Sequence, residues 1–254
     1  MTNLVPHPSG AFAYLPASTT FSNGLVVAPD HRLADWEFVE PLPLRTAFDR
    51  VAAELEQRGL TWTVLAGVEL RSPAPFTPAG FAEFNGEYTR LLAEYYPLPD
   101  GTLPPYTRTN VAPVVAHVAE PSVRLVHIVE PNPGAHGDFV VSGAAEVTGA
   151  PSPETTVAFG DTSAAGMRAK AGFVIAELAA RVAGLGVPID TVRTIDVYTA
   201  ATLEWLETVI ASTFVGASRH GVHRWIAHPP VTDLAFEMGC KRVSNRVILS
   251  DPTF

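Results

Sequence analysis

The sequence SRHGVHRWI at residues 218–226 is followed, after Pro229-Pro230, by LAFEMGC at residues 234–240. Both segments are rich in apolar and β-branched or aromatic residues, which favour strands, and the two prolines between them predict a turn. Arg219 would then lie near the start of one strand and Glu237 on the next. If both side chains face one cavity, a guanidinium group that binds carboxylates lies beside a carboxyl group that can transfer a proton. The two segments therefore predict a site for a small anionic substrate.

An arginine and a glutamate on neighbouring strands also have a simpler interpretation. Such residues often form a cross-strand pair on the surface of an antiparallel sheet, where the pair contributes little. Spacing alone favours this surface pair for Arg219 and Glu237. The interpretation as a site gains support from the rest of the chain, in which the same order of elements occurs twice.

The first half of the chain alternates between strand and helix patterns. Short apolar runs bounded by turn-forming residues predict strands at residues 24–29, 36–40, 62–71, 108–112 and 122–129. Apolar residues at helical spacing predict two helices, over residues 44–58 and 78–95. The second of these helices begins with Pro78, in the first turn, where proline is tolerated.

The second half repeats this order after Pro131-Asn132-Pro133-Gly134, a cluster of turn-forming residues. Strands are predicted at residues 139–143, 155–159 and 191–198, and helices at 166–182 and 203–214, before the two segments quoted above. Arg108 of the first copy corresponds to Arg219 of the second. We therefore predict an α+β protein of two tandem domains, residues 1–130 and 131–254, each with a mixed β-sheet and two helices packed on one face. The seam between the two copies is a natural place for a pocket.

Composition limits the classes of function. The formal net charge is −9, and 26 acidic residues outnumber 17 Lys and Arg, so binding to nucleic acid is not expected. The single cysteine, Cys240, excludes an internal disulfide. The first residues lack the basic and apolar regions of a signal peptide, and we expect a cytoplasmic protein that does not bind membranes.

Four short motifs, in this order and spacing, resemble the Rid (YjgF-like) family. They are Val141-Ser142-Gly143, Ile195-Asp196-Val197-Tyr198, Ser218-Arg219 and Ala235-Phe236-Glu237-Met238. The resemblance covers the chain as two copies, of which the second is the closer match. Residues 216–238 most resemble the two-copy branch of deaminases that act on 2-aminomuconate.

The resemblance implies two YjgF/chorismate-mutase-like domains and an enzyme that hydrolyses enamines or imines without a cofactor. Arg219 would bind the substrate carboxylate, Glu237 would orient or deprotonate water, and Ser142 and Gly143 would line the pocket. The first copy keeps Arg108 but has Val126 or His127 where the acid belongs, so one kind of site is expected.

A dicarboxylate substrate would need a second cation, for which Arg108 and Arg224 are the candidates. His223 shares the predicted strand face of Arg219 and is expected to bind substrate with it. His220 and His223 are three residues apart, so on a strand they point to opposite faces, and no metal site is predicted. Cys240 is interpreted as a buried thiol, and Glu69 and Asp196 as partners of nearby basic groups, rather than as catalytic groups.

We therefore predict an enamine or imine deaminase that releases ammonia from a small carboxylated substrate such as 2-aminomuconate. The alternative is a non-catalytic protein of the same fold that binds small ligands or supports assembly. An endoribonuclease is disfavoured by the acidic charge. Single-copy relatives form trimers, so a homo-oligomer is expected, with a trimer favoured.

Overall fold

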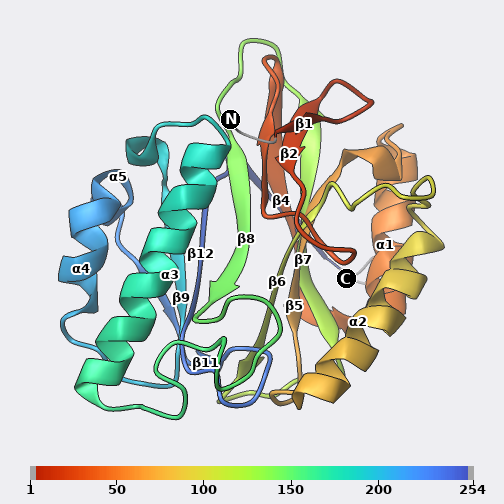
Figure 1. The fold of residues 1–254 in the computed structure, drawn as a ribbon. Helices are drawn as coiled ribbons and strands as arrows, with labels where there is room; N and C mark the ends of the chain where they lie inside the picture. Colours follow the sequence, from red (N-terminus) through yellow and green to blue (C-terminus); the bar gives the residue numbers. More distant parts are fainter. Residues whose placement is uncertain (1–3, 251–254) are drawn as a thin grey trace.

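The computed structural model describes residues 4–250 and contains two β-sheets that lie between two sets of helices (Figure 1). The helices of the first half cover one sheet, and those of the second half cover the other. Buried apolar residues from strands of both sheets, among them Leu25, Leu33 and Val140, form a core between the sheets. This is the α+β fold of two mixed sheets that the sequence predicts.

The first sheet has six strands in the order β11-β6-β5-β7-β4-β13. Four come from the first half: β4 (His31–Pro43), β5 (Leu65–Arg71), β6 (Thr107–Pro113) and β7 (Ser122–Pro131). Its helices are α1 (Leu44–Gln57) and α2 (Pro78–Ala93), with a short 3-10 turn at Trp62–Val64. The apolar stripe of α1 packs on the sheet, and the Thr77 side chain caps α2 by accepting a hydrogen bond from the Gly80 N–H.

The second sheet has seven strands in the order β1-β2-β3-β8-β12-β9-β10. The second half supplies β8 (Phe139–Ala145), β9 (Thr194–Tyr198), β10 (His223–Trp225) and β12 (Glu237–Arg242). Its helices are α3 (Ala164–Gly184), α4 (Leu206–Thr213) and the one-turn α5 (Val215–Ser218), with a 3-10 turn at Ile189–Thr191. The Ser163 side chain caps α3 by accepting a hydrogen bond from the Gly166 N–H.

The two halves exchange strands at their ends. The N-terminal strands β1 (Val5–Pro6), β2 (Phe12–Leu15) and β3 (Gly24–Val27) belong to the second sheet, where β3 pairs with β8. Conversely, β11 (Ala227–His228) and β13 (Asn245–Leu249) from the C-terminal part pair with β6 and β4 of the first sheet. The predicted boundary near residue 131 coincides with the passage from one sheet to the other, but each sheet is completed by the opposite end of the chain.

Two predicted strands differ from the structure. Residues 155–159 form turns, in which the Ser152 carbonyl accepts a hydrogen bond from the Thr156 N–H and Ala158 has a positive φ of 46°. Residues 218–226 are not one strand, because α5 ends at Ser218 and β10 begins only at His223. Both segments form turns because their local hydrogen bonds outweigh the weak preference of Thr, Val and Trp for strands.

No helix within residues 4–250 is long and apolar enough to cross a membrane.

The strand exchange predicts that neither half folds alone. A fragment of residues 1–130 lacks β11 and β13 of the first sheet, and its strand β3 lacks its partner β8. A fragment of residues 131–254 lacks β1–β3 of the second sheet, and its strands β11 and β13 lack their partners β6 and β4. Each fragment is expected to show no cooperative thermal unfolding by circular dichroism, whereas a mixture recovers it. A cooperative transition for either fragment by itself would contradict the prediction.

Candidate functional site

A cavity of about 680 Å³ opens where β6 of the first sheet meets β8 and β12 of the second. Its wall contains two cations, Arg108 and Arg181, one carboxyl group, Glu237, and the amides of Asn23, Asn85 and Asn110. The rest of its surface is mostly apolar. A cavity of this size with a few converging polar groups is typical of a small-molecule site.

Arg108 is the buried cation of this cavity. Only 4% of the residue is exposed, and its NH1 donates a hydrogen bond to Asn85 Oδ1 over 2.7 Å. The guanidinium carbon lies 4.9 Å from the ring centroid of Phe21 and 5.3 Å from that of Phe81. Burial lowers the pKa of Arg108 to about 10, so the group stays charged at neutral pH. A desolvated guanidinium between aromatic rings is well suited to hold a carboxylate.

Glu237, the first residue of β12, supplies the carboxyl group. It is 4% exposed and has no ion pair within 4.0 Å among the described residues. Burial raises the pKa of Glu237 to about 8, the nearby Glu146 carboxylate adds to this effect, and Arg108 and Arg181 oppose it. A carboxyl group that titrates near neutral pH can both donate and accept a proton, as a general acid–base needs.

A buried ion pair fixes the backbone that leads into Glu237. Glu146 is fully buried and accepts hydrogen bonds from the N–H groups of Ala235, over 2.6 Å, and Phe236, over 3.0 Å. Lys170 of α3 lies 3.2 Å from the Glu146 carboxylate. Helix α3 thus determines where β12 begins and where the Glu237 side chain enters the cavity.

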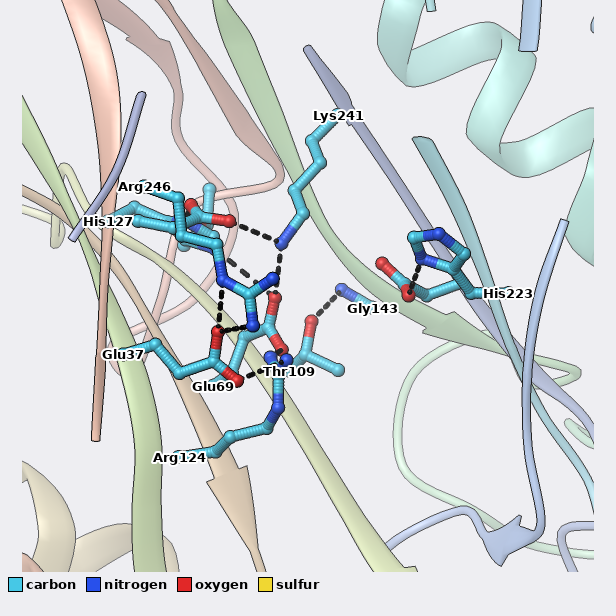
Figure 2. Close-up of polar contacts among 12 residues, drawn as sticks. Glu37, Glu69, Thr109, Arg124, His127, Gly143, His223, Lys241 and Arg246 are labelled. Atoms are coloured by element: carbon cyan, nitrogen blue, oxygen red, sulfur yellow. Dashed lines mark hydrogen bonds and ion pairs between the residues drawn. The ribbon is translucent and has the colours of Figure 1, made fainter. Parts of the chain in front are cut away.

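Gly143 provides the space that the Glu237 side chain occupies. A Cβ atom at this position would overlap with Glu237 Oε1 and would approach Thr109 Cγ2 to 3.2 Å. The Gly143 N–H donates to Thr109 Oγ1 over 3.1 Å, a contact between the two sheets that is drawn in Figure 2. Gly143 therefore lines the cavity, as the sequence predicts, because only glycine leaves room for the carboxyl group there.

Ser142 lies beside the cavity rather than in its wall. It is fully buried, and its hydroxyl donates to the Ser22 carbonyl over 2.6 Å and accepts from the Arg108 N–H over 3.0 Å. Its carbonyl accepts a hydrogen bond from Arg181 NH1 over 3.2 Å. Ser142 thus positions both arginines of the cavity, Arg108 through its backbone and Arg181 through its guanidinium group.

The structure does not bring Arg219 and Glu237 together. Arg219 caps the C-terminus of α5, is exposed and does not line the cavity of Glu237. Its predicted position on a strand facing that of Glu237 is wrong, because the chain forms a helical turn there and β10 starts four residues later. The cations that share a cavity with Glu237 are Arg108, which the sequence analysis matches to Arg219, and Arg181.

His223 lies at a second cavity, of about 510 Å³, on a different part of the seam. Its side chain is 61% exposed, and its Nδ1 lies 3.3 Å from Asp196 Oδ1. Arg224, the other candidate for a second cation, points outwards and pairs with Glu207. Neither residue lines the cavity of Glu237.

A network of charged residues occupies the seam next to this second cavity (Figure 2). Lys241 of β12 reaches across to the first sheet and lies 2.8 Å from Glu69 and 3.1 Å from Asp35. Arg124 lies 2.9 Å from both Glu69 and Glu37. The sequence predicts that Glu69 and Asp196 are partners of nearby basic groups rather than an acid pair. Glu69 pairs with Lys241 and Arg124, and Asp196 lies 3.3 Å from His223 Nδ1 and also accepts a hydrogen bond from Trp225 Nε1 over 2.8 Å.

Cys240 has no access to either cavity. It is 2% exposed in the core of the second half, and burial raises the pKa of its thiol to about 12. A thiol in this environment is not a nucleophile at neutral pH. In residues 4–250, no three His, Cys, Asp or Glu side chains cluster as a metal site would require.

Several polar residues of the cavity were not identified from the sequence, among them Asn85, Asn110 and Arg181. Arg181 has a helical position in α3 and an i,i+4 partner in Glu177, which is the pattern of an ordinary surface pair. Asn110 stands two residues after Arg108, so alternation along β6 places both on one face. That alternation is the one sequence signal that points to Asn110.

Comparison with known proteins gives a match over nearly the whole chain. The family model described as 2-aminomuconate deaminase CnbZ matches residues 4–247. A 2-amino-5-chloromuconate deaminase from Comamonas testosteroni is 32% identical over 254 residues, which cover 98% of this chain and 100% of the relative.

Solved structures show a related fold at low sequence identity. A chorismatase matches with a TM-score of 0.53 and 14% identity, and the match covers 91% of this chain and 81% of the chorismatase chain. A putative endoribonuclease from Thermotoga maritima matches 44% of this chain and 82% of its own, with 17% identity and a TM-score of 0.30, which is too low to bear on fold or function.

Replacing Glu237 by glutamine should change how stability depends on pH. In the folded protein Glu237 holds its proton up to about pH 8, whereas its ordinary pKa is 4.5, so the folded state binds more protons between these values. Stability from this group is complete below pH 4.5 and is lost as pH rises towards 8. Relative to Glu237→Gln, the wild type should lose free energy of unfolding between pH 5 and 8.5 in denaturant titrations. Parallel pH curves would show that the Glu237 pKa is not raised.

Gly143→Ala should destabilise the protein by about 1–3 kcal/mol, because the added methyl group overlaps with the Glu237 carboxyl group and meets Thr109. The matched control is Gly86→Ala on the exposed face of α2, where no atom lies within 4 Å of the added methyl. That control should stabilise the helix by up to about 1 kcal/mol. If the two variants have equal free energies of unfolding, a glycine at position 143 is not needed to make room for the Glu237 side chain.

Proposed function

Because this chain belongs to the 2-aminomuconate deaminase family, we propose that it hydrolyses the enamine or imine form of a 2-aminomuconate-type substrate and releases ammonia. The observation that carries the proposal is the enclosure of Arg108 and Glu237 in one cavity. The non-catalytic alternative is not favoured, since both the family and the 32% identical relative are named as deaminases.

Arg108 binds one substrate carboxylate in this proposal. Its guanidinium group is desolvated and packs against Phe21 and Phe81. Little water therefore has to leave the guanidinium group when a carboxylate binds to it. Arg181 adds a second positive charge to the same cavity. Two cations and one carboxyl group that stays protonated near neutral pH make the cavity suitable for a dianionic substrate.

Glu237 carries the proton transfers. In its protonated form it donates to a carbon of the enamine, which converts the C–NH2 group to a C=NH2⁺ iminium. The resulting carboxylate takes a proton from water as the water oxygen bonds to the iminium carbon. The carbinolamine then collapses: Glu237, which is protonated again, donates a proton to the amino nitrogen, the carbon–nitrogen bond breaks and ammonia leaves. The Glu237 carboxylate takes the proton of the hydroxyl group as the carbon becomes a ketone, so Glu237 ends the cycle protonated. One water is consumed and one ammonia is released.

The raised pKa of Glu237 suits both roles. A carboxyl group at its ordinary pKa would be almost fully ionised near pH 7 and could not supply the first proton. Burial between the sheets keeps a large fraction protonated, and the opposing charges of Arg108 and Arg181 prevent the pKa from rising further. The reaction is expected to need no cofactor, because water and this one group account for every proton that moves.

The test uses enzymatically generated 2-aminomuconate and follows ammonia release. Wild-type protein should release ammonia well above the rate in buffer. Glu237→Gln should lower kcat by about 10²–10⁴-fold, the range for loss of a general acid–base. Arg108→Gln should lower kcat/KM by about tenfold to a hundredfold, the equivalent of a lost charged hydrogen bond.

Arg219→Gln tests the assignment made from the sequence in the same assay. The cavity favours Arg108, so Arg219→Gln should behave like wild type and like Arg193→Gln, a substitution at another exposed arginine. If Arg219→Gln loses turnover but keeps its thermal stability, Arg219 rather than Arg108 binds the substrate carboxylate. Absence of ammonia release by folded wild-type protein would overturn the proposed function.

The cytoplasmic location and the assembly into a homo-oligomer, with a trimer favoured, stay predictions.

A further inference from the structure

The side-chain amide of Asn110 has an unused hydrogen-bond donor at the cavity. Asn110 is 3% exposed and lines the cavity of Arg108 and Glu237. Its Oδ1 accepts a hydrogen bond from the hydroxyl of Ser72, also fully buried, over 2.9 Å. Its Nδ2 is shielded from solvent and has no hydrogen-bond partner in the part of the chain that the structure describes.

A buried donor without a partner destabilises a protein by about 1–3 kcal/mol. Native structures rarely keep such a group without a purpose, and a ligand that supplies an acceptor removes the cost. Because Ser72 holds the oxygen of the amide, the NH2 group is the part left for a ligand, and since Nδ2 is shielded from solvent, a ligand contacts it only when the amide turns towards the cavity. The missing partner is therefore a hydrogen-bond acceptor, such as a carboxylate oxygen.

Arg108 and Asn110 stand two residues apart on β6, which sets the backbone separation from which their side chains reach towards the cavity. Residues two apart on a strand lie roughly 6.6 Å from each other on the same face. A six-carbon dicarboxylate has its carboxyl carbons five bonds apart, a length of the same order. Strand β6 thus presents one carboxylate-binding group for each end of such a molecule.

The positive charge of the cavity is concentrated near Arg108 and Arg181, which we call its Arg108 end. Arg108 and Arg181 both hydrogen-bond to Ser142, through a backbone N–H and a guanidinium group respectively. Towards the other end, β11 pairs with β6 at Ala112 and Pro113, and the apolar Pro230 and Val231 that follow β11 join the wall. Among the amides of the wall in the described residues, Asn110 is the one whose NH2 group is buried without a partner.

We propose that Asn110, oriented by Ser72, binds the second carboxylate of the substrate and makes the enzyme selective for dicarboxylates. The inference rests on the proposed function, which it extends from one carboxylate to two. Asn110 is a specificity residue in this arrangement and takes no part in proton transfer.

Two unreactive ligands separate this role from catalysis: trans,trans-muconate, the six-carbon diene with two carboxylates, and sorbate, the same diene with one. Isothermal titration calorimetry on the full-length protein should show that wild type binds muconate more tightly than sorbate. Asn110→Leu removes the donor at similar size and should weaken muconate binding by about tenfold to a hundredfold. Sorbate binding should change by less than about twofold.

Asn85→Leu is the matched control in the same cavity. Asn85 hydrogen-bonds to Arg108, which holds the carboxylate that both ligands share, so this variant should weaken muconate and sorbate by similar factors. Asn110→Asp keeps the size of the side chain and replaces the donor with a negative charge, and it should reverse the preference in favour of sorbate. Ser72→Ala, which leaves residue 110 unchanged, should lose part of the preference.

Equal losses for both ligands in Asn110→Leu and Asn110→Asp, or an unchanged preference, would overturn the inference. Suppose that wild type prefers muconate and that the variants lose this preference, but that wild type releases no ammonia from 2-aminomuconate. The inference then stands and the proposed function fails. If wild type releases ammonia while the variants show no change in selectivity, only the inference fails.

Discussion

The burial of one carboxyl group between two β-sheets is the constraint on which this site depends. Glu237 lies at the start of β12, at the point where the second sheet meets β6 of the first. Loss of water raises its pKa to about 8, against the opposing effect of Arg108 and Arg181. The proposed chemistry depends on this balance, since a solvated glutamate would be almost fully ionised at neutral pH.

The rest of the seam maintains that burial. The pair of Glu146 and Lys170 holds the backbone before Glu237, and Gly143 leaves the space for its side chain. Further along the seam, Lys241 bridges to Asp35 and Glu69 of the first sheet. A buried charge without a partner would be strongly destabilising, so these contacts resist any shift of one sheet relative to the other.

The two halves of the chain supply different groups at this seam. The first half gives the cation Arg108, and the second half gives the carboxyl group of Glu237. The exchange of β1–β3 and of β11 and β13 makes each sheet depend on both ends of the chain. The second cavity, where His223 lies, is bordered by charges that already pair with one another, which distinguishes it from the cavity with the free amide of Asn110.

The sequence by itself determined the family and most of the strands and helices, because periodic apolar patterns and turn residues act locally. The turns at residues 155–159 and the helical turn before β10 were not predicted. The sequence identified Glu237, Gly143 and Arg108 as residues of interest for the same reason, since each lies in a recognisable strand. Only the tertiary structure decided that Glu237 faces Arg108 rather than Arg219, which caps a helical turn in solvent. Pairing across a seam depends on how two sheets pack, and residues more than a hundred positions apart, such as Arg108 and Glu237, leave no periodic signal of their contact.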